Sequence, residues 1–555
     1  MLAQTLGTFL LLAMGWQDSP PAARVDALFK EYDSAASPGC AVAVFQGDRI
    51  LYKRAYGMAN LDHDVRLSTS SVFHVASVSK QFTAAAILLL AQDGKLGLDD
   101  DIRKHVPELP DFGATITIRQ LANHTSGIRD QWDLLGLAGW RYSRDLITDA
   151  DVLELLARQK DLNFPPGTRH MYSNSGYTLL AVIVSRVSGK SFREFTTERI
   201  FAPLGMTNTH FRDAFTEVVK NQAYGYAPYG QTFRLSTTNF DTAGATSLLT
   251  TVEDMVRWYA NFDTGAVGGE KLLGGLMDRG VLKDGTRIDY AFGMTHGTYR
   301  GAATIGHGGA DAGYRADFVR FTNPRLGVAT MCNIANANPS VLSRRVAEVF
   351  LPDGTLAPAV EPKPDTSPEV PLPKEQLARF AGLYWNQADS VERQIALDAS
   401  GRLQAVLGPR SVPLKSLGAG AFVMTTAPGA RISFEEVSGG AVHLKPAPTG
   451  PVLIRMEPFK PSADQLAEYA GVYRSDEMDA VFRISVKNGG LQLFRTKLPA
   501  VAIDPMFKDG FRSPSGVIQF SRDPAGRVSG FLLEGGRVRH LKFWKDTSPP
   551  RAGTY

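Results

Sequence analysis

The run Ala76-Ser77-Val78-Ser79-Lys80-Gln81-Phe82-Thr83-Ala84-Ala85-Ala86-Ile87-Leu88-Leu89-Leu90-Ala91-Gln92 decides the fold. Apolar side chains occupy every face of the helix that it predicts over residues 79–92, so that helix should be buried. Ser77 then lies at the helix N-terminus, where backbone N–H groups can stabilise an oxyanion, and Lys80 follows one turn later on the same face. The pattern predicts a serine nucleophile whose proton is taken by a desolvated lysine of lowered pKa. Taken alone, it also fits an N-cap serine beside a solvated lysine.

A tyrosine and an asparagine two positions apart form a second motif. Phe164-Pro165-Pro166-Gly167 forces a turn, and Tyr172-Ser173-Asn174 follows it, before a helix predicted from Gly176. Both side chains can face one cleft, where Tyr172 could pass protons between nucleophile, leaving group and water and Asn174 could hold a substrate carbonyl or the lysine. Taken alone, these residues also fit a core tyrosine and a turn asparagine.

A glycine-rich strand supplies the third motif, His307-Gly308-Gly309-Ala310. The glycines of this run let the strand approach a ligand closely, and Gly309 is among the expected substrate-binding residues. His307 would offer a donor or partial charge to the substrate, and the backbone N–H of Ala310 would be the second donor to an oxyanion. Because an imidazole titrates near neutrality, we expect His307 to make substrate affinity pH-dependent. The alternative is a glycine-rich turn with a surface histidine.

In this order, the three motifs resemble those of the serine β-lactamase and DD-peptidase superfamily, whose third motif is more often Lys-Thr-Gly. Within it, the chain is most similar to the class C β-lactamase-like branch, which includes D-aminopeptidases, D-alanyl-D-alanine carboxypeptidases and some esterases. The resemblance covers residues 25–350 and includes the stretches Phe73-His74-Val75-Ala76, Leu121-Ala122-Asn123-His124-Thr125-Ser126-Gly127 and Gly306-His307-Gly308-Gly309. It implies an α+β catalytic domain, an α/β sandwich. In it Ser77 is acylated, Lys80 and Tyr172 share proton transfer, Asn174 positions substrate and His307 lies on the strand beside the cleft.

The third motif departs from the β-lactamase pattern. Histidine in place of lysine weakens the fixed positive charge that β-lactamases use for the β-lactam carboxylate, so we expect peptidase or esterase activity ahead of β-lactam hydrolysis. Arg315 could supply a carboxylate anchor instead, although surface arginines are usually solvated.

These residues predict a serine hydrolase that forms an acyl-enzyme with a small peptide, amide or ester. The expected function is that of a D-aminopeptidase or a DD-peptidase-like amidase on D-amino-acid peptides. An esterase or a weak class C-like β-lactamase is the alternative within the same chemistry, and a catalytically silent penicillin-binding receptor is the alternative from another class. The complete set of nucleophile, base and oxyanion donors favours the enzyme.

Composition and motifs argue against other classes of function. Lys+Arg number 60 against 56 Asp+Glu, and no long basic run is present, so nucleic acid is not an expected partner. The ten histidines form no His-Glu-x-x-His motif, and no Gly-x-Gly-x-x-Gly or Walker pattern occurs, so no metal and no cofactor are expected.

The start of the chain reads as an export signal. An apolar run over residues 6–14 is followed by polar sequence from Gln17, which predicts a signal peptide over residues 1–15 and a periplasmic or secreted protein, although no Lys or Arg precedes the run. The run is too short to span a bilayer, so no stable transmembrane anchor is expected. The alternative is a disordered or buried apolar N-terminus.

Cys40 and Cys332 are the only cysteines, which excludes a disulfide framework and a cysteine-based zinc cage. Each lies in a β-like apolar run. We expect buried thiols, and the sequence leaves open whether the two are bonded to each other.

The catalytic domain is expected over residues 22–355. Its pattern predicts a β-hairpin around Gly47-Asp48, helices at 150–158 and 176–187, and strands at 314–321 and 326–334. One sheet built from both ends of the domain, enclosing a helical middle, fits this order.

Seven prolines between Leu351 and Lys374 predict an unpacked, semi-rigid linker over residues 356–373. Beyond it, Leu377-Ala378-Arg379-Phe380-Ala381-Gly382-Leu383-Tyr384 is repeated as Leu466-Ala467-Glu468-Tyr469-Ala470-Gly471-Val472-Tyr473. With the β-rich sequence that follows each copy, this predicts two all-β barrel domains, 374–460 and 461–555, of the up-and-down type. The paired domains resemble the D-aminopeptidase architecture, in which one barrel can send a loop into the cleft. In the acidic loop Ser475-Asp476-Glu477-Met478-Asp479, a carboxylate could meet a substrate amine, or the charges simply face water.

Overall fold

The structure, a computed structural model, describes residues 20–359, 365–408, 410–426, 430–437, 440–447 and 450–547. The predicted signal peptide, residues 1–15, lies outside the described residues. The chain forms two compact units. The first contains the chain up to Ile128 together with Tyr142–Glu154 and Phe164–Ala357, and the second contains Arg129–Arg141, Leu155–Asn163 and the chain from Pro358 onward. Two short segments of the predicted catalytic domain therefore cluster with the C-terminal barrels.

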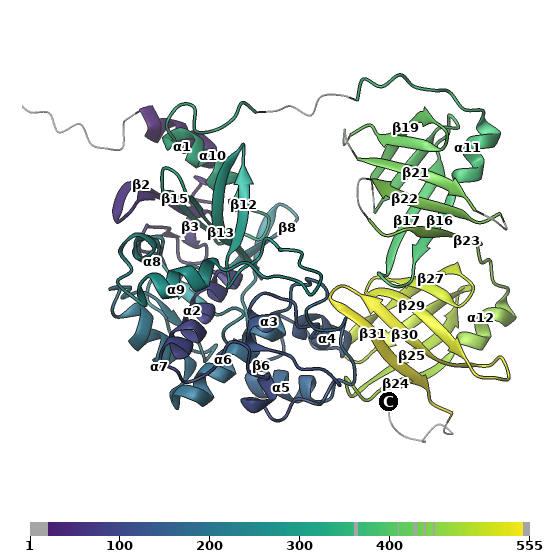
Figure 1. Ribbon diagram of the computed structural model, residues 1–555, viewed down its shortest axis with the longest axis horizontal. Coiled ribbons are helices and arrows are strands. Elements are labelled where there is room, and N and C mark those ends of the chain that lie inside the picture. The colour runs from purple at the N-terminus through teal and green to yellow at the C-terminus, as the bar shows by residue number, and fades with distance from the viewer. Residues whose placement is uncertain are drawn as a thin grey trace, which may run out of the picture. The chain divides into compact units, whose positions relative to one another are not determined.

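An antiparallel six-stranded sheet organises the first unit, in the order β12-β13-β14-β15-β1-β2 (Figure 1). Its strands are β12 (Thr295–Tyr299), β13 (Ala302–Asp311), β14 (Tyr314–Phe321), β15 (Leu326–Cys332), β1 (Cys40–Gln46) and β2 (Arg49–Tyr56). The hairpin between β1 and β2 turns at Gly47-Asp48, as predicted. Both chain ends of the unit supply strands, which confirms the predicted sheet with a helical middle.

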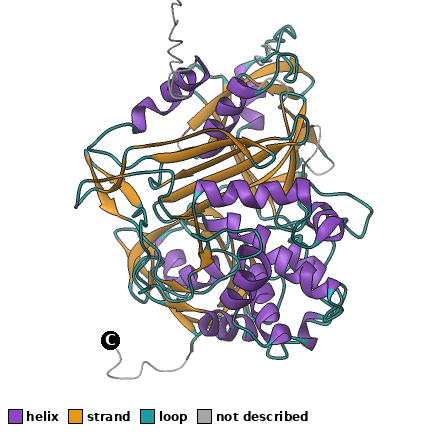
Figure 2. Cartoon of the chain, turned by 90° about the vertical axis from the view of Figure 1, so that its left-hand side faces the viewer, coloured by secondary structure: helices purple, strands orange, loops and turns teal. Residues whose placement is uncertain are grey.

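Helices cover both faces of this sheet (Figure 2). On one face, α1 (Pro20–Phe29) and α10 (Pro339–Phe350) bury Phe29 and Val346 against Val44 of β1. On the other face lies α8 (Val252–Thr264), whose Tyr259 ring centroid is 5.7 Å from that of Phe45. Because β1 is covered on both sides, its sequence is apolar at consecutive positions rather than at alternate ones.

Between β2 and β12, helices are the main regular structure, as predicted for the middle of the domain. Residues 79–90 of α2 (Ser79–Gln92) are all buried, which confirms the expectation from its apolar faces. The other helices here are α3 (Ile118–Ala122), α4 (Gln131–Leu137), α5 (Asp149–Ala157), α6 (Asn174–Ser188), α7 (Phe192–Thr196) and α9 (Gly269–Met277). The remaining short strands are β3 (Met58–Asn60), β4 (Val65–Arg66), β5 (Phe73–His74), β6 (Ile147–Thr148), β7 (His210–Phe211), β8 (Tyr226–Tyr229), β9 (Thr232–Leu235), β10 (Phe240–Asp241) and β11 (Leu248–Thr250). Among the described residues, no helix has the length and apolar character needed to cross a membrane.

The two cysteines form a disulfide bond, which corrects the expectation of buried thiols. β1 and β15 are antiparallel neighbours, and their register places Cys40 directly opposite Cys332. The sequence could not show this pairing because the two cysteines are 292 positions apart. The bond ties the first strand of the domain to its last.

The second unit contains two closed barrels of eight antiparallel strands, which confirms the predicted barrel pair (Figure 1). The first barrel consists of β16 (Gly382–Asn386), β17 (Val391–Leu397), β18 (Leu403–Leu407), β19 (Arg410–Gly418), β20 (Ala421–Met424), β21 (Arg431–Glu436), β22 (Val442–Ala447) and β23 (Leu453–Met456). The second consists of β24 (Gly471–Ser475), β25 (Ala480–Lys487), β26 (Gly490–Arg495), β27 (Leu498–Phe507), β28 (Gly510–Ser513), β29 (Gly516–Arg522), β30 (Val528–Gly535) and β31 (Val538–Lys545). A short helix precedes each barrel, α11 (Lys374–Phe380) and α12 (Ala463–Tyr469).

The sequence repeat marks the same structural feature in both barrels, the junction of the short helix with the first strand. Tyr384 donates a hydrogen bond to the carbonyl of Phe380 at 2.9 Å, and Tyr473 donates one to the carbonyl of Tyr469 at 2.8 Å. Both tyrosines are fully buried. The repeat therefore encodes the same contact in both barrels, a hydrogen bond from the first strand to the short helix before it.

Described residues near both ends of the proline-rich stretch make contacts with the rest of the chain. Leu356 packs on the core of the first unit, and the backbone N–H of Val370 donates to the carbonyl of Ser416 at 3.0 Å. Lys415 in turn pairs with Asp365. These contacts involve residues near both ends of the stretch, and the linker bounds 356–373 stay a prediction.

Candidate active site

Ser77 lies in a 3₁₀ turn, Ala76–Val78, immediately before α2 rather than on the first residues of the α-helix. Ala76 has φ 49°, a left-handed conformation that a side chain disfavours. Backbone strain of this kind concentrates at functional sites. The turn leaves Ser77 partly exposed while its neighbours on both sides are buried.

Lys80 is fully buried and its ammonium group is held by three oxygens. Its Nζ lies 3.2 Å from Ser77 Oγ, 2.8 Å from Asn174 Oδ1 and 2.7 Å from the carbonyl oxygen of Ala245. Asn174 and Ala245 thus aim the amine at the serine hydroxyl. This geometry is what proton transfer from a serine nucleophile requires.

Aromatic rings surround the amine on its other sides. Lys80 Nζ lies 4.8 Å from the ring centroid of Tyr172 and 5.4 Å from that of Tyr177. The His124 ring lies tilted against that of Tyr172, with a centroid separation of 4.2 Å, and His124 Nδ1 accepts a hydrogen bond from the backbone N–H of Ser173. His124 therefore fixes the loop that carries Tyr172. The sequence showed His124 only as part of a family-like stretch, and nothing in it pointed to Tyr177.

His307 is buried and both of its ring nitrogens have partners. Nδ1 lies 2.6 Å from the carbonyl oxygen of Gly308, to which it donates, and Nε2 lies 2.9 Å from the hydroxyl of Tyr290 and accepts from it. Burial and the nearby charge of Lys80 lower the pKa of His307 to about 4. The ring is therefore uncharged at neutral pH, which corrects the expectation that it titrates near neutrality. Tyr290, which holds it, had no signature in the sequence.

We predict that this histidine makes the protein sensitive to acid rather than making catalysis sensitive near pH 7. Its folded pKa, about 4, lies below the ordinary value of 6.5, so the unfolded chain takes up the proton first as the pH falls. As the pH falls from 6.5 to about 4, the free energy of unfolding of the wild type should fall by about 3 kcal/mol more than that of His307→Gln. Thermal unfolding of both proteins at pH 7.5 and pH 4.5 measures the difference, and the comparison cancels the other histidines. Equal destabilisation of the two proteins by acid would contradict the assignment.

The strand that carries His307 lies against the nucleophile turn. A Cβ atom on Gly309 would lie 2.2 Å from the carbonyl oxygen of Val75, whereas one on Gly308 would meet nothing closer than 3.8 Å. Gly309 is therefore the glycine that allows the close approach of β13 to the turn. Ala310 follows directly, so its backbone N–H remains our candidate for the second oxyanion donor.

Arg315 lies opposite Ala310 in the β13–β14 ladder. Its guanidinium donates to the carbonyl oxygens of Ala312 and Tyr314, at 3.0 and 2.6 Å. The side chain thus stabilises the turn between the two strands.

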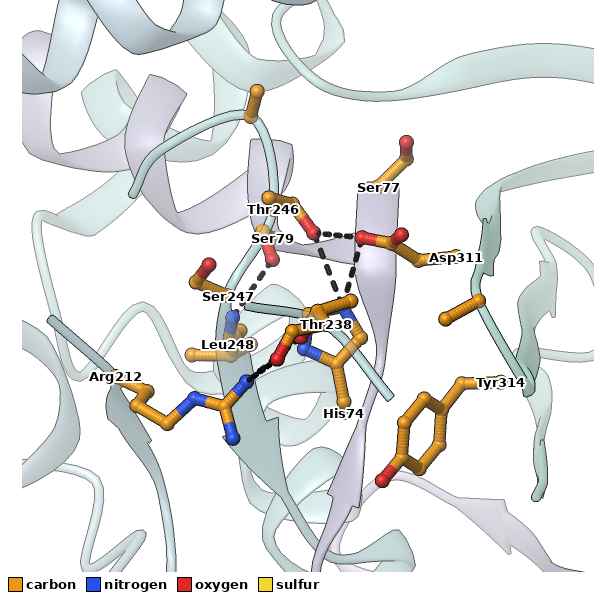
Figure 3. A network of polar contacts seen from close by, with 12 residues as sticks. His74, Ser77, Ser79, Arg212, Thr238, Thr246, Ser247, Leu248, Asp311 and Tyr314 are labelled. Carbon is orange, nitrogen blue, oxygen red and sulfur yellow. Dashed lines mark hydrogen bonds and ion pairs between the residues drawn. The ribbon is translucent and has the colours of Figure 1, made fainter. Parts of the chain in front are cut away.

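A buried polar network lies beside the nucleophile turn (Figure 3). Asp311 Oδ2 lies 3.0 Å from His74 Nε2 and accepts from Thr246 Oγ1 at 2.7 Å. Since the Thr246 hydrogen points to Asp311, His74 must carry its hydrogen on Nε2. Tyr142 donates to the other carboxylate oxygen. The network joins β13 to the strand that precedes Ser77, and Asp311 had not been singled out from the sequence.

A cavity of about 520 Å³ lies next to Tyr172 and His307. Its lining consists of His170, Tyr172, Arg287, Ile288, Asp289, Tyr290, Thr295, His307 and Gly308. Within the part of the chain that the structure describes, no cluster of three metal-ligating side chains occurs. Tyr172 of the second motif and His307 and Gly308 of the third are the motif residues that this cavity exposes.

The acidic loop of the second barrel does not expose all of its charge. Glu477 is 3% exposed, and its carboxylate accepts from Arg129 Nη1 at 2.5 Å and from the backbone N–H of Lys160 at 2.8 Å. Asp476 forms an exposed ion pair with Lys160. Glu477 therefore neither faces water nor is available to a substrate amine, because it binds segments of this chain hundreds of positions away.

The family model described as Beta-lactamase matches residues 25–350. The chain belongs to the β-lactamase family. A D-aminopeptidase of Brucella melitensis is 26% identical over 517 residues, which cover 89% of this chain and 93% of that protein. As a member of this family with such relatives, the chain is a serine hydrolase.

Two solved structures share the fold of this family member. The octameric penicillin-binding protein homologue from Pyrococcus abyssi has a TM-score of 0.55 and 22% identity, covering 78% of this chain and 99% of that one. A D-amino acid amidase from Ochrobactrum anthropi has a TM-score of 0.52 and 22% identity, covering 60% of this chain and 99% of that one. These likenesses confirm the predicted fold class.

Proposed function

We propose that the protein is an amidase that removes D-amino acids from the N-terminus of small peptides or amides through an acyl-enzyme on Ser77. The observation that carries the chemistry is the contact of Lys80 Nζ with Ser77 Oγ, held in place by Asn174 and Ala245. The substrate class is supported by the similarity to D-aminopeptidases, which extends over both barrels as well as the catalytic domain.

In the proposed mechanism, Lys80 takes the proton of Ser77, and Ser77 Oγ attacks the substrate carbonyl carbon. Backbone N–H groups of Ser77 and Ala310 stabilise the oxyanion. The proton passes through Tyr172 to the leaving nitrogen as the amide bond breaks, which leaves an ester on Ser77. Water, deprotonated along the same path, then hydrolyses the ester and restores the serine.

Hydrolysis of β-lactams ranks below amidase activity in this proposal. A β-lactam carboxylate next to the third motif would meet His307, whose lowered pKa leaves it uncharged at neutral pH. Esterase activity remains the alternative within the same mechanism, since the alcohol of an ester is a better leaving group than the amine of an amide.

A matched set of chromogenic substrates tests the proposal. Purified protein should hydrolyse D-alanine p-nitroanilide with kcat/KM at least tenfold above the L-enantiomer, above N-acetylated D-alanine p-nitroanilide and above a chromogenic cephalosporin. Faster hydrolysis of the cephalosporin, or equal rates for free and acetylated amines, would contradict the aminopeptidase assignment. Turnover of p-nitrophenyl esters alone would favour the esterase.

We also propose that the protein is exported to the periplasm or secreted. The disulfide between Cys40 and Cys332 supports this, because such bonds persist in oxidising compartments and are rare in the cytosol.

A further inference from the structure

The cavity beside His307 is lined by Tyr172, a residue that takes part in the proposed mechanism. Tyr172, the proposed donor of a proton to the leaving nitrogen, lines this cavity together with His307. A group that receives a proton from Tyr172 must be next to it when the amide bond breaks. In the proposed mechanism, the side chains that line the cavity can therefore contact the departing amino acid or peptide.

The cavity wall contains two uncharged histidines and one carboxylate that is already in an ion pair. Loss of solvent lowers the pKa of both His170 and His307, so neither ring adds positive charge at neutral pH. Asp289 is paired with Arg279, whose Nη2 lies 2.5 Å from Asp289 Oδ1. Arg287 is left as the cationic group of the wall, and among the described residues no carboxylate forms an ion pair with it.

Arg287 is carried by an ordered hairpin rather than by a loose loop. The backbone N–H of Gly280 donates to the carbonyl of Tyr290, and that of Ile288 donates to the carbonyl of Gly280, both at 2.9 Å. Val281 and Arg287 face each other as an antiparallel bridge. The hairpin also contacts the loop before Tyr172, since the N–H of Lys283 donates to the carbonyl of Gly167 at 2.8 Å.

We propose that Arg287 is a specificity residue that binds the free carboxylate of the leaving amino acid or peptide; this inference rests on the proposed function. A guanidinium matches a carboxylate with two parallel hydrogen bonds, and the absence of a competing carboxylate on Arg287 keeps those donors available. The preferred substrates are then short peptides with an unblocked C-terminus rather than amides or long chains. Arg315, the anchor considered from the sequence, is instead engaged with the carbonyls of its own turn.

The test compares two substrates that differ only at the C-terminus, D-Ala-D-Ala and D-Ala-D-Ala-amide. In the full-length protein, Arg287→Gln should lower kcat/KM at least tenfold for the free acid and less than twofold for the amide. Arg287→Lys should recover part of the loss, because it restores the charge without the paired hydrogen bonds. Lys283→Gln serves as the control, since Lys283 is an exposed cation on the same hairpin outside the cavity lining.

The outcomes separate the anchor from the proposed function. An equal loss on acid and amide, or no loss on either, would overturn the role of Arg287. Hydrolysis of D-alanine p-nitroanilide, which has an uncharged leaving group, reports the amidase activity by itself. If that substrate is turned over while the ratio of acid to amide is the same in wild type and Arg287→Gln, only the anchor is wrong; if no D-amino acid derivative is turned over, the proposed function fails instead.

Discussion

Ser77→Ala should abolish hydrolysis of every substrate and covalent labelling by a fluorophosphonate probe. Its hydroxyl is the one that Lys80 Nζ contacts, at 3.2 Å, and without it no acyl-enzyme can form. The expected fall in kcat is at least about 10⁴-fold, a magnitude typical of losing a covalent nucleophile. Mass spectrometry of the intact protein after incubation with the probe gives the same answer without depending on the choice of substrate.

Ser79→Ala is the matched control, because it removes a second hydroxyl two positions further along the chain. Ser79 is fully buried, and its Oγ accepts a hydrogen bond from the backbone N–H of Leu248 at 3.1 Å (Figure 3). Losing that bond should cost about 1–2 kcal/mol of stability. Labelling should persist in this variant. Labelling that survives in Ser77→Ala and disappears in Ser79→Ala would transfer the nucleophile to Ser79.

The sequence was sufficient for the parts of the fold that depend on local pattern. The apolar faces of residues 79–92 predicted a buried helix, and α2 has those bounds. The repeated segment at Tyr384 and Tyr473 predicted two barrels because the same helix–strand junction is encoded twice. Ser77 and Asn174, which the family-like motifs predict to act with Lys80, both lie within hydrogen-bonding distance of the Lys80 amine.

What the sequence could not show are contacts between residues that only the fold brings together. Burial and the nearby charge of Lys80 lower the pKa of His307, so the ring is neutral, although a histidine in isolation titrates near neutrality. Glu477 lies in a run of charge that usually faces water, yet it is buried against Arg129, 348 positions away. In both cases the local sequence predicts the usual property of the residue type, a histidine that titrates near neutrality and an exposed glutamate. Burial in the folded protein changes that property.

Lys80→Met and Tyr172→Phe test whether the amine and the phenol share one proton path. Methionine replaces the buried lysine with a chain of similar length and no charge, and phenylalanine removes only the hydroxyl of Tyr172. Each single change should lower kcat by about 10²–10⁴-fold, the range expected for general acid–base groups. Because Lys80 Nζ lies 4.8 Å from the Tyr172 ring and both groups serve the same proton, the double variant should be little slower than the slower single variant.

The decisive measurement is the rate of acylation in single turnover with a p-nitrophenyl ester, because it isolates the first proton transfer from deacylation. Thermal unfolding of the three variants checks that the loss is chemical, since Lys80→Met also removes a donor from Asn174 and Ala245. If the two losses multiply in the double variant, Lys80 and Tyr172 act on different protons, and Tyr172 then serves the leaving group alone. Losses that do not multiply would place both residues on one path that carries the proton away from Ser77.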